Sequence, residues 1–583
     1  MMSRGWLAWF LAVLMLFAGH ARAADAIKPG QRFVAVAFHD VVDDPAQLDS
    51  DAVTTARLVE FFDYLRGTGW KPVTLDEVDA ARRGERPLPD KAILVTFDDG
   101  YSSLYTRVFP LVLAYRVPIV AALQGSWLAP PPGSQVAHGS ASVPREKFIT
   151  SEQAREMARS GLVEFASHSY DLQHGVPGNP QGNEMPAAVT RLYAKNAYES
   201  ETAYRTRLAD DLRKSREFVA DFTGRPPRAM VWPFGRYSAV ATEVAQSVGF
   251  SFALTLDPEP ANAALPMRLP RYLPTGNPVL AEIDANLRFR PRLPSAQRVV
   301  CVDPGQVWTG DATGTNERLG RLIERLRRLG STAVVIDVVA RDASGSIAAA
   351  WFPNSELPVR ADVLSRLVWQ LQTRAGVEAW LRVPSTTALA AMGDTARVRR
   401  LFGELGAQVP ASGVVIEGAP GLAGQRAEPG EGGAMPWQVR QLRALPNAAT
   451  LAAPDALALQ VFGEVERWRT PLKLVLLAEA GASVEPSALA DFTLFPVTVD
   501  SAPRFTERFA ADRPSGINPG RRIGLWLTGS AAPTAKELVA TTRRFQLAGG
   551  TAFGWCPDDA PGDMPPADQV APDVSASTFP VRF

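Results

Sequence analysis

The sequence predicts an α/β protein with two domains, and two observations support this fold class. Strand-like apolar runs alternate with helical segments between residues 32 and 273, which favours parallel strands joined by helices. Eight further apolar runs follow, and eight units in about 285 residues suit a (β/α)8 barrel, whose usual size is ~250 residues. The eight runs are Val299–Val302, Ala333–Val338, Glu378–Val383, Val414–Ile416, Leu472–Leu477, Thr493–Val499, Ile523–Leu527 and Ala552–Trp555.

In the first domain, the segments follow one another as short strands and amphipathic helices. The run Arg32–Phe38 is a predicted strand, and residues 56–66 have helical spacing, with Leu58, Phe61, Phe62 and Leu65 on one face. The apolar, β-branched run 92–97 is a predicted buried strand. Further strands are expected at 117–123, 162–166, 250–256 and 268–273, and residues 229–235 are expected to form a strand and a turn. Helices are expected to begin at Ser151 and to span 201–222.

The composition is that of a globular protein with sizeable cores. Of 583 residues, 46% are hydrophobic and 21% are charged. Lys+Arg and Asp+Glu both number 61, so the net charge gives no argument for nucleic acid or an anionic membrane as a partner. The two cysteines, Cys301 and Cys556, exclude a disulfide scaffold and a Cys-rich zinc site. Whether they pair stays open.

The first residues indicate export. Arg4 supplies a positive n-region, residues 6–18 form a short apolar region, and Ala21-Arg22-Ala23 is a small-x-small cleavage site. We expect cleavage after Ala23 and a soluble, exported protein, with no cysteine nearby for a lipid anchor and no later run long enough to span a membrane. The expected organisation is a signal peptide (1–23), a first domain (24–287), a Pro-rich linker (288–297) and a barrel (298–583) with a disordered tail from about 560.

Polar residues follow the predicted strands at the points where those strands end. Asp98 and Asp99 close the run 92–97, and because side chains alternate along a strand, one can bind a metal while its neighbour stays free as a base. The alternative is an ordinary Asp-Gly turn. His168 directly follows another strand, with His174 nearby. One carboxylate and two imidazoles form a common ligand set for a catalytic divalent metal.

These motifs resemble those of the NodB-like polysaccharide deacetylases, carbohydrate esterase family four. The matching segments are Thr96-Phe97-Asp98-Asp99-Gly100, Ser167-His168-Ser169 and Trp232-Pro233-Phe234-Gly235. The sequence is most similar to the periplasmic poly-β-1,6-N-acetyl-D-glucosamine N-deacetylases, which join such a domain, a distorted β/α barrel, to a C-terminal barrel of a glycoside-hydrolase type. Marks of that branch include Trp351-Phe352-Pro353-Asn354 and Trp555-Cys556-Pro557-Asp558-Asp559.

The resemblance implies a role for each matching residue. Asp98 is expected to be the general base, His39 the general acid, and Asp99 and His168 ligands of one divalent metal ion: zinc first, with nickel, cobalt and iron as alternatives. The family places its second histidine four to five residues after the first. Here Gln173 holds that position and His174 lies one further. Either His174 completes the site, which we expect because imidazole is the better ligand for a zinc-like ion, or Gln173 does so through its amide oxygen, or the third position is empty. Tyr101, Trp232, Pro233 and Phe234 are expected to bind substrate, although Trp232 and Phe234 could equally be core residues.

The function that the resemblance implies is metal-dependent N-deacetylation of poly-β-1,6-N-acetyl-D-glucosamine in the periplasm, during biofilm export. The expected partners are that polymer and an outer-membrane polysaccharide exporter, with no nucleic acid and no transmembrane anchor. Hydrolases of this branch carry His-Asp-Asp after the fourth barrel strand, whereas Ile416-Glu417-Gly418 stands there in this chain. This departure argues against hydrolysis by the barrel. The two alternative functions are a glycoside hydrolase acting through the barrel and a non-catalytic glycan-binding export factor.

Overall fold

The computed structural model describes residues 31–577, apart from 140, 289–295, 427, 429–435, 443–450, 480–481, 483 and 512–521. The chain forms two compact units, and each is described by itself. The first unit contains residues 25–178 and 184–291, and the second includes residues 292–583. The predicted signal peptide and most of the predicted linker lie outside the described residues.

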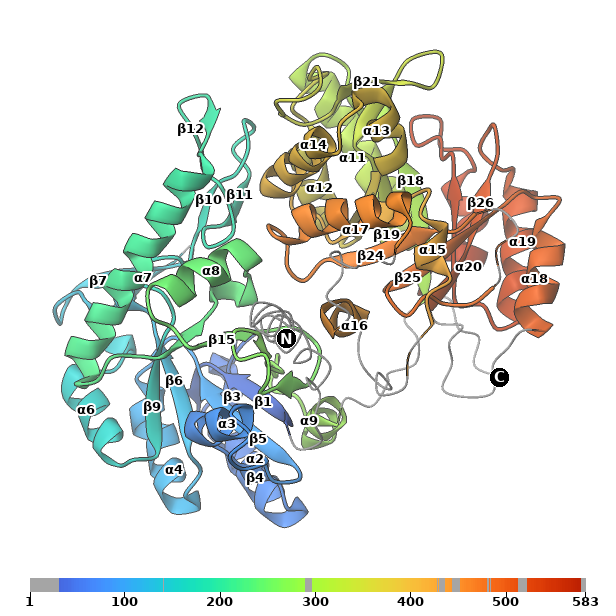
Figure 1. The fold of residues 1–583 in the computed structure, drawn as a ribbon. Coiled ribbons are helices and arrows are strands. Elements are labelled where there is room, and N and C mark those ends of the chain that lie inside the picture. Colours follow the sequence, from blue (N-terminus) through green and yellow to red (C-terminus); the bar gives the residue numbers. More distant parts are fainter. Residues whose placement is uncertain are drawn as a thin grey trace, which may run out of the picture. The chain divides into compact units, whose positions relative to one another are not determined.

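The first unit is built on one mainly parallel sheet that nearly closes into a barrel (Figure 1). Only the edge strand β16 pairs antiparallel, with β1. At the far edge, the backbone of Tyr272 exchanges hydrogen bonds of 2.8 Å with Ala35 and Ala37 of β1, which brings the two ends of the sheet together. The strand order is β16 (Ala261–Asn262), β1 (Arg32–Phe38), β5 (Ala92–Phe97), β6 (Ile119–Leu123), β9 (Val163–Ser167), β14 (Ala229–Val231), β15 (Phe252–Thr255) and β17 (Leu269–Pro270), with β4 (Lys71–Pro72) also beside β5.

Amphipathic helices surround this sheet. In α2, the predicted face of Leu58, Phe61, Phe62 and Leu65 is buried, and it packs with the outward-facing residues of β1 and β5 in one apolar cluster. The helices of the unit are α2 (Thr55–Thr68), α3 (Leu75–Arg82), α4 (Phe109–Tyr115), α5 (Gly125–Leu128), α6 (Ser151–Arg159), α7 (Glu201–Thr223), α8 (Ala239–Ser247) and α9 (Leu280–Leu287). The small two-stranded sheets are β2–β3 (Val41–Val42, Val53–Thr54), β7–β8 (Gln135–His138, Ala141–Pro144), β10–β11 (Gly175–Pro177, Glu184–Pro186) and β12–β13 (Tyr193–Ala194, Ala197–Tyr198).

The second unit is a closed parallel barrel, so the predicted fold class is confirmed in both halves of the chain. The eight predicted apolar runs correspond to its eight strands. These are β18 (Gln297–Val302), β19 (Ala333–Asp337), β22 (Glu378–Val383), β23 (Gly413–Ile416), β24 (Lys473–Leu477), β25 (Phe492–Val497), β26 (Ile523–Thr528) and β27 (Ala552–Cys556).

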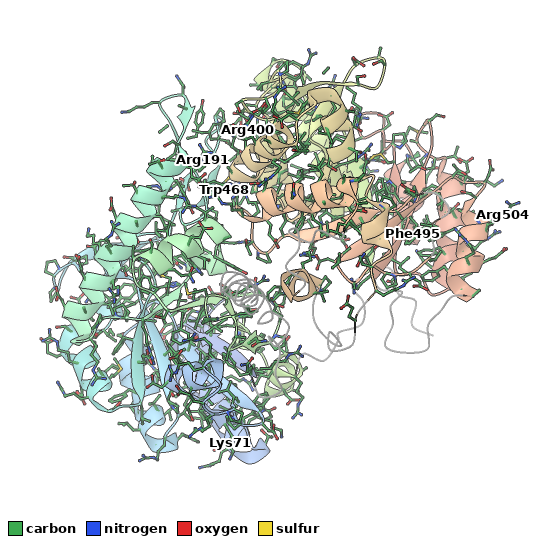
Figure 2. The ribbon with its side chains drawn as sticks, in the orientation of Figure 1. Lys71, Arg191, Arg400, Trp468, Phe495 and Arg504 are labelled. Carbon is green, nitrogen blue, oxygen red and sulfur yellow. A yellow bond between two sulfur atoms is a disulfide. The ribbon has the colours of Figure 1, made fainter. Side chains whose placement is uncertain are left out.

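Helices pack around the outside of this barrel. Phe495 of β25 stacks against Phe505 of α18 with ring centroids 5.5 Å apart, whereas Arg504 lies on the exposed side of that helix (Figure 2). The helices are α10 (Pro304–Val307), α11 (Ala312–Leu329), α12 (Leu364–Gln370), α13 (Ser385–Met392), α14 (Thr395–Gln408), α15 (Pro420–Ala423), α16 (Pro436–Leu442), α17 (Ala453–Glu466), α18 (Ala502–Ala511), α19 (Ala535–Leu547) and α20 (Ala567–Val574); a hairpin, β20–β21 (Val339–Arg341, Ile347–Ala350), follows β19.

The seam between the first and last barrel strands is closed covalently. Cys301 of β18 and Cys556 of β27 form a disulfide across a sequence separation of 255 residues. Just beyond it, Asp558 accepts two hydrogen bonds from Arg325 of α11 and one from Trp555 Nε1. A disulfide is typical of proteins that fold outside the cytoplasm.

The expectation of a disordered tail from about residue 560 is wrong over the part of the tail that is described. Residues 567–574 form α20, which buries Ala567, Val570 and Val574 against the barrel unit. The Pro/Asp-rich composition suggested disorder, but these three apolar side chains share one helical face and gain a packing surface on α11 and α19. Among the described residues, no helix is long and apolar enough to cross a membrane.

Candidate active site

The two adjacent carboxylates lie where β5 ends, inside the first unit. The backbone N–H of Asp98 donates to the carbonyl of Phe38 on the neighbouring β1 at 2.8 Å. Asp99 and Gly100 then both adopt left-handed backbone angles, with φ of 75° and 76°. A side chain at position 100 would put its Cβ 2.9 Å from Leu123, so the chain needs glycine there. This sharp turn aims the two carboxylates at different partners, as the alternation predicts.

Asp98 is held by a buried arginine. Arg271 follows β17, and its two terminal nitrogens donate to the two Asp98 oxygens at 2.8 and 2.9 Å. Arg271 also donates to Thr96 Oγ1 at 2.7 Å, and its side chain is fully buried. Burial alone would raise the pKa of Asp98, but Arg271 and the nearby His168 and His39 lower it to about 2. Asp98 is therefore an oriented carboxylate at neutral pH.

Asp99 and His168 face each other at the same end of the sheet. His168 Nε2 lies 3.4 Å from Asp99 Oδ1, and both side chains are buried. His168 Nδ1 lies 2.9 Å from the carbonyl of Val231, which can only accept, so Nδ1 donates; in the neutral imidazole the lone pair is then on Nε2, which faces Asp99. Asp99 Oδ1 is buried with no hydrogen-bond partner among the described residues. Burial raises the pKa of Asp99.

These two groups fit a divalent cation. A buried carboxylate oxygen without a donor is costly, and a cation beside it would remove that cost. The carbonyl that orients His168 is the usual outer partner of a metal-binding histidine. Within the described chain, however, no three His, Cys, Asp or Glu side chains come together as a ligand group.

The structure does not bring His174 to this pair. His174 is exposed, and its backbone carbonyl accepts from the N–H of Ala187 at 3.1 Å as the hairpin β10–β11 begins. Starting that hairpin turns the histidine side chain outward. Gln173 is half-buried instead, and its Oε1 is buried with no partner in the described structure. Of the two alternatives, Gln173 is the one with an unused ligand atom.

His39 stands beside Asp98, as expected from its place after β1. Its Nε2 lies 3.9 Å from Asp98 Oδ2, and 13% of its side chain is exposed. Its Nδ1 is buried and makes no hydrogen bond to any described residue. The imidazole therefore lies close to the carboxylate, and part of it stays exposed.

The four residues expected to bind substrate differ in exposure. Trp232 is fully buried, which favours the core alternative over substrate binding: its backbone N–H donates to the carbonyl of Leu254 at 3.2 Å, and its indole Nε1 is buried with no partner among the described residues. Pro233 is also buried. Tyr101 is 6% exposed and its hydroxyl lies 2.8 Å from His138 Nε2. Phe234 is 49% exposed, with a left-handed φ of 56°, and is the one of the four that can stack on a ligand.

The barrel unit has its own group of acidic residues at the ends of its strands. Arg382 Nε lies 2.6 Å from Glu417 Oε1 and 3.4 Å from Asp337 Oδ1. Burial raises the pKa of Asp337, as do the neighbouring carboxylates of Asp303 and Glu417, against the opposing charge of Arg382. Asp303 and Asp337 line a cavity of about 930 Å³ together with Trp308 and Trp351.

Comparison with known proteins agrees with this architecture. Residues 85–253 match the family described as "Polysaccharide deacetylase", and residues 301–398 match "Hypothetical glycosyl hydrolase family 13". The chain thus belongs to the polysaccharide deacetylase family, with a second unit of glycosyl-hydrolase type. The predicted family is confirmed.

Several named proteins are similar to this chain over part of its length. The Poly-beta-1,6-N-acetyl-D-glucosamine N-deacetylase of Escherichia coli strain K12 is 37% identical over 362 residues, which cover 61% of this chain and 54% of that protein. The chain thus spans about half the length of this relative. The solved BpsB deacetylase domain of Bordetella bronchiseptica is 37% identical, covering 42% of this chain and 97% of that one, with a TM-score of 0.39. A de-N-acetylase from Aggregatibacter actinomycetemcomitans is 34% identical, covering 44% and 99%, with a TM-score of 0.42.

Proposed function

We propose that this protein removes N-acetyl groups from poly-β-1,6-N-acetyl-D-glucosamine, with the help of one divalent metal ion. The observation that carries the proposal is the buried pair of Asp99 and His168 beside the Arg271-bound Asp98. The name of the Escherichia coli relative supplies the substrate. Zinc is the first candidate for the ion, followed by nickel, cobalt and iron.

Each residue of the site has a role that follows from its surroundings. Asp99 and His168 would hold the ion, with the amide oxygen of Gln173 as the third side chain, and the ion would act as a Lewis acid toward the N-acetyl carbonyl. Asp98 accepts the proton of the attacking water, because Arg271 keeps it ionised and oriented. His39, 3.9 Å from Asp98, donates a proton to the departing sugar nitrogen. Water and the amide become acetate and a glucosamine residue.

The test of this proposal is acetate release from a β-1,6-linked N-acetylglucosamine oligomer. Asp98→Asn keeps the size of the side chain but cannot accept the proton, so activity should fall by ~10²–10⁴-fold, as is typical for loss of a general base. Zinc binding should persist, since Asp99 and His168 are untouched. A variant that keeps more than a few per cent of the wild-type rate would remove Asp98 from the role of base.

The proposed setting is the periplasm, during export of a biofilm polysaccharide. The signal-like N-terminus supports export, and the Cys301–Cys556 disulfide supports an oxidising compartment. An outer-membrane polysaccharide exporter is the proposed partner. Co-purification of the polymer with the exported protein, lost on deletion of the exporter, would test this setting.

For the barrel unit we propose glycan binding rather than hydrolysis. A glycosidase needs one carboxyl group as acid and a second as nucleophile or base. Here Arg382 lies within 3.4 Å of both Asp337 and Glu417, so neither carboxylate is free for that task. The cavity walls of Trp308 and Trp351 offer apolar surfaces on which a sugar ring can pack. Release of reducing ends from the polymer by the full chain would contradict this assignment, and polymer binding that is weakened by Trp308→Ala would support it.

A further inference from the structure

The loop that presents His168 is held in a backbone conformation that its own residues disfavour. Ser169 has a φ of 73°, in the left-handed region that residues other than glycine rarely adopt. Its hydroxyl donates to Gln124 Oε1 at 3.0 Å and accepts from the N–H of Leu172 at 3.0 Å. The loop, residues 167–172, therefore depends on contacts from other elements to keep His168 aimed at Asp99.

One face of α7 supplies the largest set of these contacts, and α7 runs beside β9 (Figure 1). Asp211, Lys214 and Ser215 lie three and four residues apart, so they share that face. The hydroxyl of Ser215 lies 2.6 Å from that of Ser167, and Lys214 Nζ lies 3.6 Å from the centre of the Tyr170 ring. Gly125 of α5 also lies against the loop. A Cβ at this position would come 2.5 Å from the Tyr170 ring, so only glycine fits there.

Asp211 makes two of the contacts that hold the backbone of the loop; on α5, the N–H groups of Gly125 and Ser126 donate to the carbonyls of Ser169 and Tyr170 at 3.1 and 2.7 Å. Asp211 Oδ1 accepts from the N–H of Tyr170 at 2.9 Å, and its Oδ2 accepts from the N–H of Asp171 at 2.8 Å. Two donors need two acceptor oxygens, which an ionised carboxylate provides and an amide does not. Burial raises the pKa of Asp211 to about 6, although both amide hydrogen bonds lower it. The side chain is therefore ionised at neutral pH.

We propose that Asp211 is a positioning residue for the metal site: it clamps the backbone of residues 170 and 171 and thereby sets the direction of His168 and of the chain that follows. The inference deepens the proposed function and rests on it, because it concerns the direction of a metal ligand. The hairpin that begins at residue 175 then determines which of two neighbours turns inward: Gln173 is half-buried and His174 is exposed.

The test compares two neighbouring carboxylates of α7 in the full chain. Asp211→Asn removes one acceptor and places an amide N–H against a backbone N–H. Asp210→Asn makes the same chemical change at an exposed residue paired with Arg213 and is the matched control. Zinc affinity is measured by chelator competition, amide exchange of residues 167–172 by mass spectrometry, and the unfolding midpoint by urea titration.

Asp211→Asn should weaken zinc binding by about 10- to 100-fold, the usual effect of removing a partner that orients a ligand. The amides of Tyr170 and Asp171 should exchange at least tenfold faster, while Asp210→Asn changes neither quantity. Should Asp211→Asn fail to fold, Lys214→Met removes the ring contact and a positive charge that acts on Asp211, and a smaller loss of zinc affinity in that variant is the expected result.

Zinc affinity within twofold of wild type in a folded Asp211→Asn protein would overturn the inference, whether or not the loop exchanges faster. In the event of an unfolded Asp211→Asn protein, unchanged zinc affinity in Lys214→Met would do the same. A wild type that binds none of zinc, nickel, cobalt and iron would instead overturn the proposed function. In that case loop exchange alone decides whether Asp211 clamps the loop, and unaltered exchange rejects the clamp as well.

Discussion

Removing the arginine that binds Asp98 should destabilise the first unit in a way that depends on pH. Arg271→Met keeps most of the side-chain length but leaves the Asp98 carboxylate buried without its two charge-assisted hydrogen bonds. Breaking a buried ion pair by removing one partner typically costs about 3–5 kcal/mol. We expect a loss of that size in the free energy of unfolding at pH 7.

The pH dependence follows from the pKa of Asp98. In the wild type it is about 2, below the ordinary 3.8, so ionised Asp98 favours the folded state. At ~1.4 kcal/mol per pKa unit this contributes about 2 kcal/mol above pH ~4, and the contribution is lost as the pH falls toward ~2. In Arg271→Met, burial is opposed only by His168 and His39, so the pKa of Asp98 should lie above its wild-type value and the variant should gain less stability than the wild type as the pH rises. The difference in unfolding free energy between the wild type and Arg271→Met should therefore become smaller from pH 7 to pH 4.

Urea unfolding followed by tryptophan fluorescence at pH 7, 5 and 4 measures this difference. Arg268→Met is the matched control, because Arg268 also pairs with buried carboxylates, Asp257 and Glu259, three residues before Arg271. It should lose stability and still release acetate. Adding Asp98→Asn to Arg271→Met should restore part of the stability, since no charge remains buried. A difference in unfolding free energy below ~1 kcal/mol between the wild type and Arg271→Met would refute the reasoning. So would a double variant whose destabilisation equals the sum of the two single effects.

Three further predictions concern the ligand loop, the N-terminus and the disulfide. Gln173→Ala should weaken zinc, nickel and cobalt binding several-fold and Gln173→His should strengthen it, while His174→Ala stays within twofold of wild type; the reverse order in metal titrations would place His174 at the site. N-terminal sequencing of the periplasmic fraction should find a start near Ala24, and an uncleaved form retained in membranes would contradict the predicted signal. Replacing Cys301 and Cys556 by alanine should cost up to ~5 kcal/mol in the free energy of unfolding, because their bond closes a chain segment of 255 residues. An unfolding midpoint insensitive to reductant would reject that estimate.

The sequence was most informative where strands are buried on both faces. Each barrel strand reads as an apolar, often β-branched run, because helices cover its outer side and other side chains fill its inner side. The positions of Asp98, Asp99, His39 and His168 followed from the same pattern, since each comes directly after such a run.

The parts that could not be predicted depend on contacts between distant segments. Arg271 follows a strand of two residues, and nothing local distinguishes it from an exposed arginine. Its role becomes visible only once β17 is known to close the sheet near β1, and an arginine at the end of the last strand-like run was the one available signal. Asp211 likewise lies among the charged residues of α7. Spacing alone could not separate Gln173 from His174, because the hairpin at residue 175 decides which of them turns outward.

The pairing of the first barrel strand with the last also sets the order in which the second unit can fold. β18 pairs with β27, so one edge of β18 stays open until residues 552–556 have emerged, more than 250 residues later. An open edge of a parallel strand is a template for pairing with other chains, and long-range closure of this kind is slow. While the chain is being made, the barrel therefore remains an incomplete sheet until nearly its whole length has been synthesised. A chaperone that shields β18 during that interval would raise the yield of folded protein without changing its final stability.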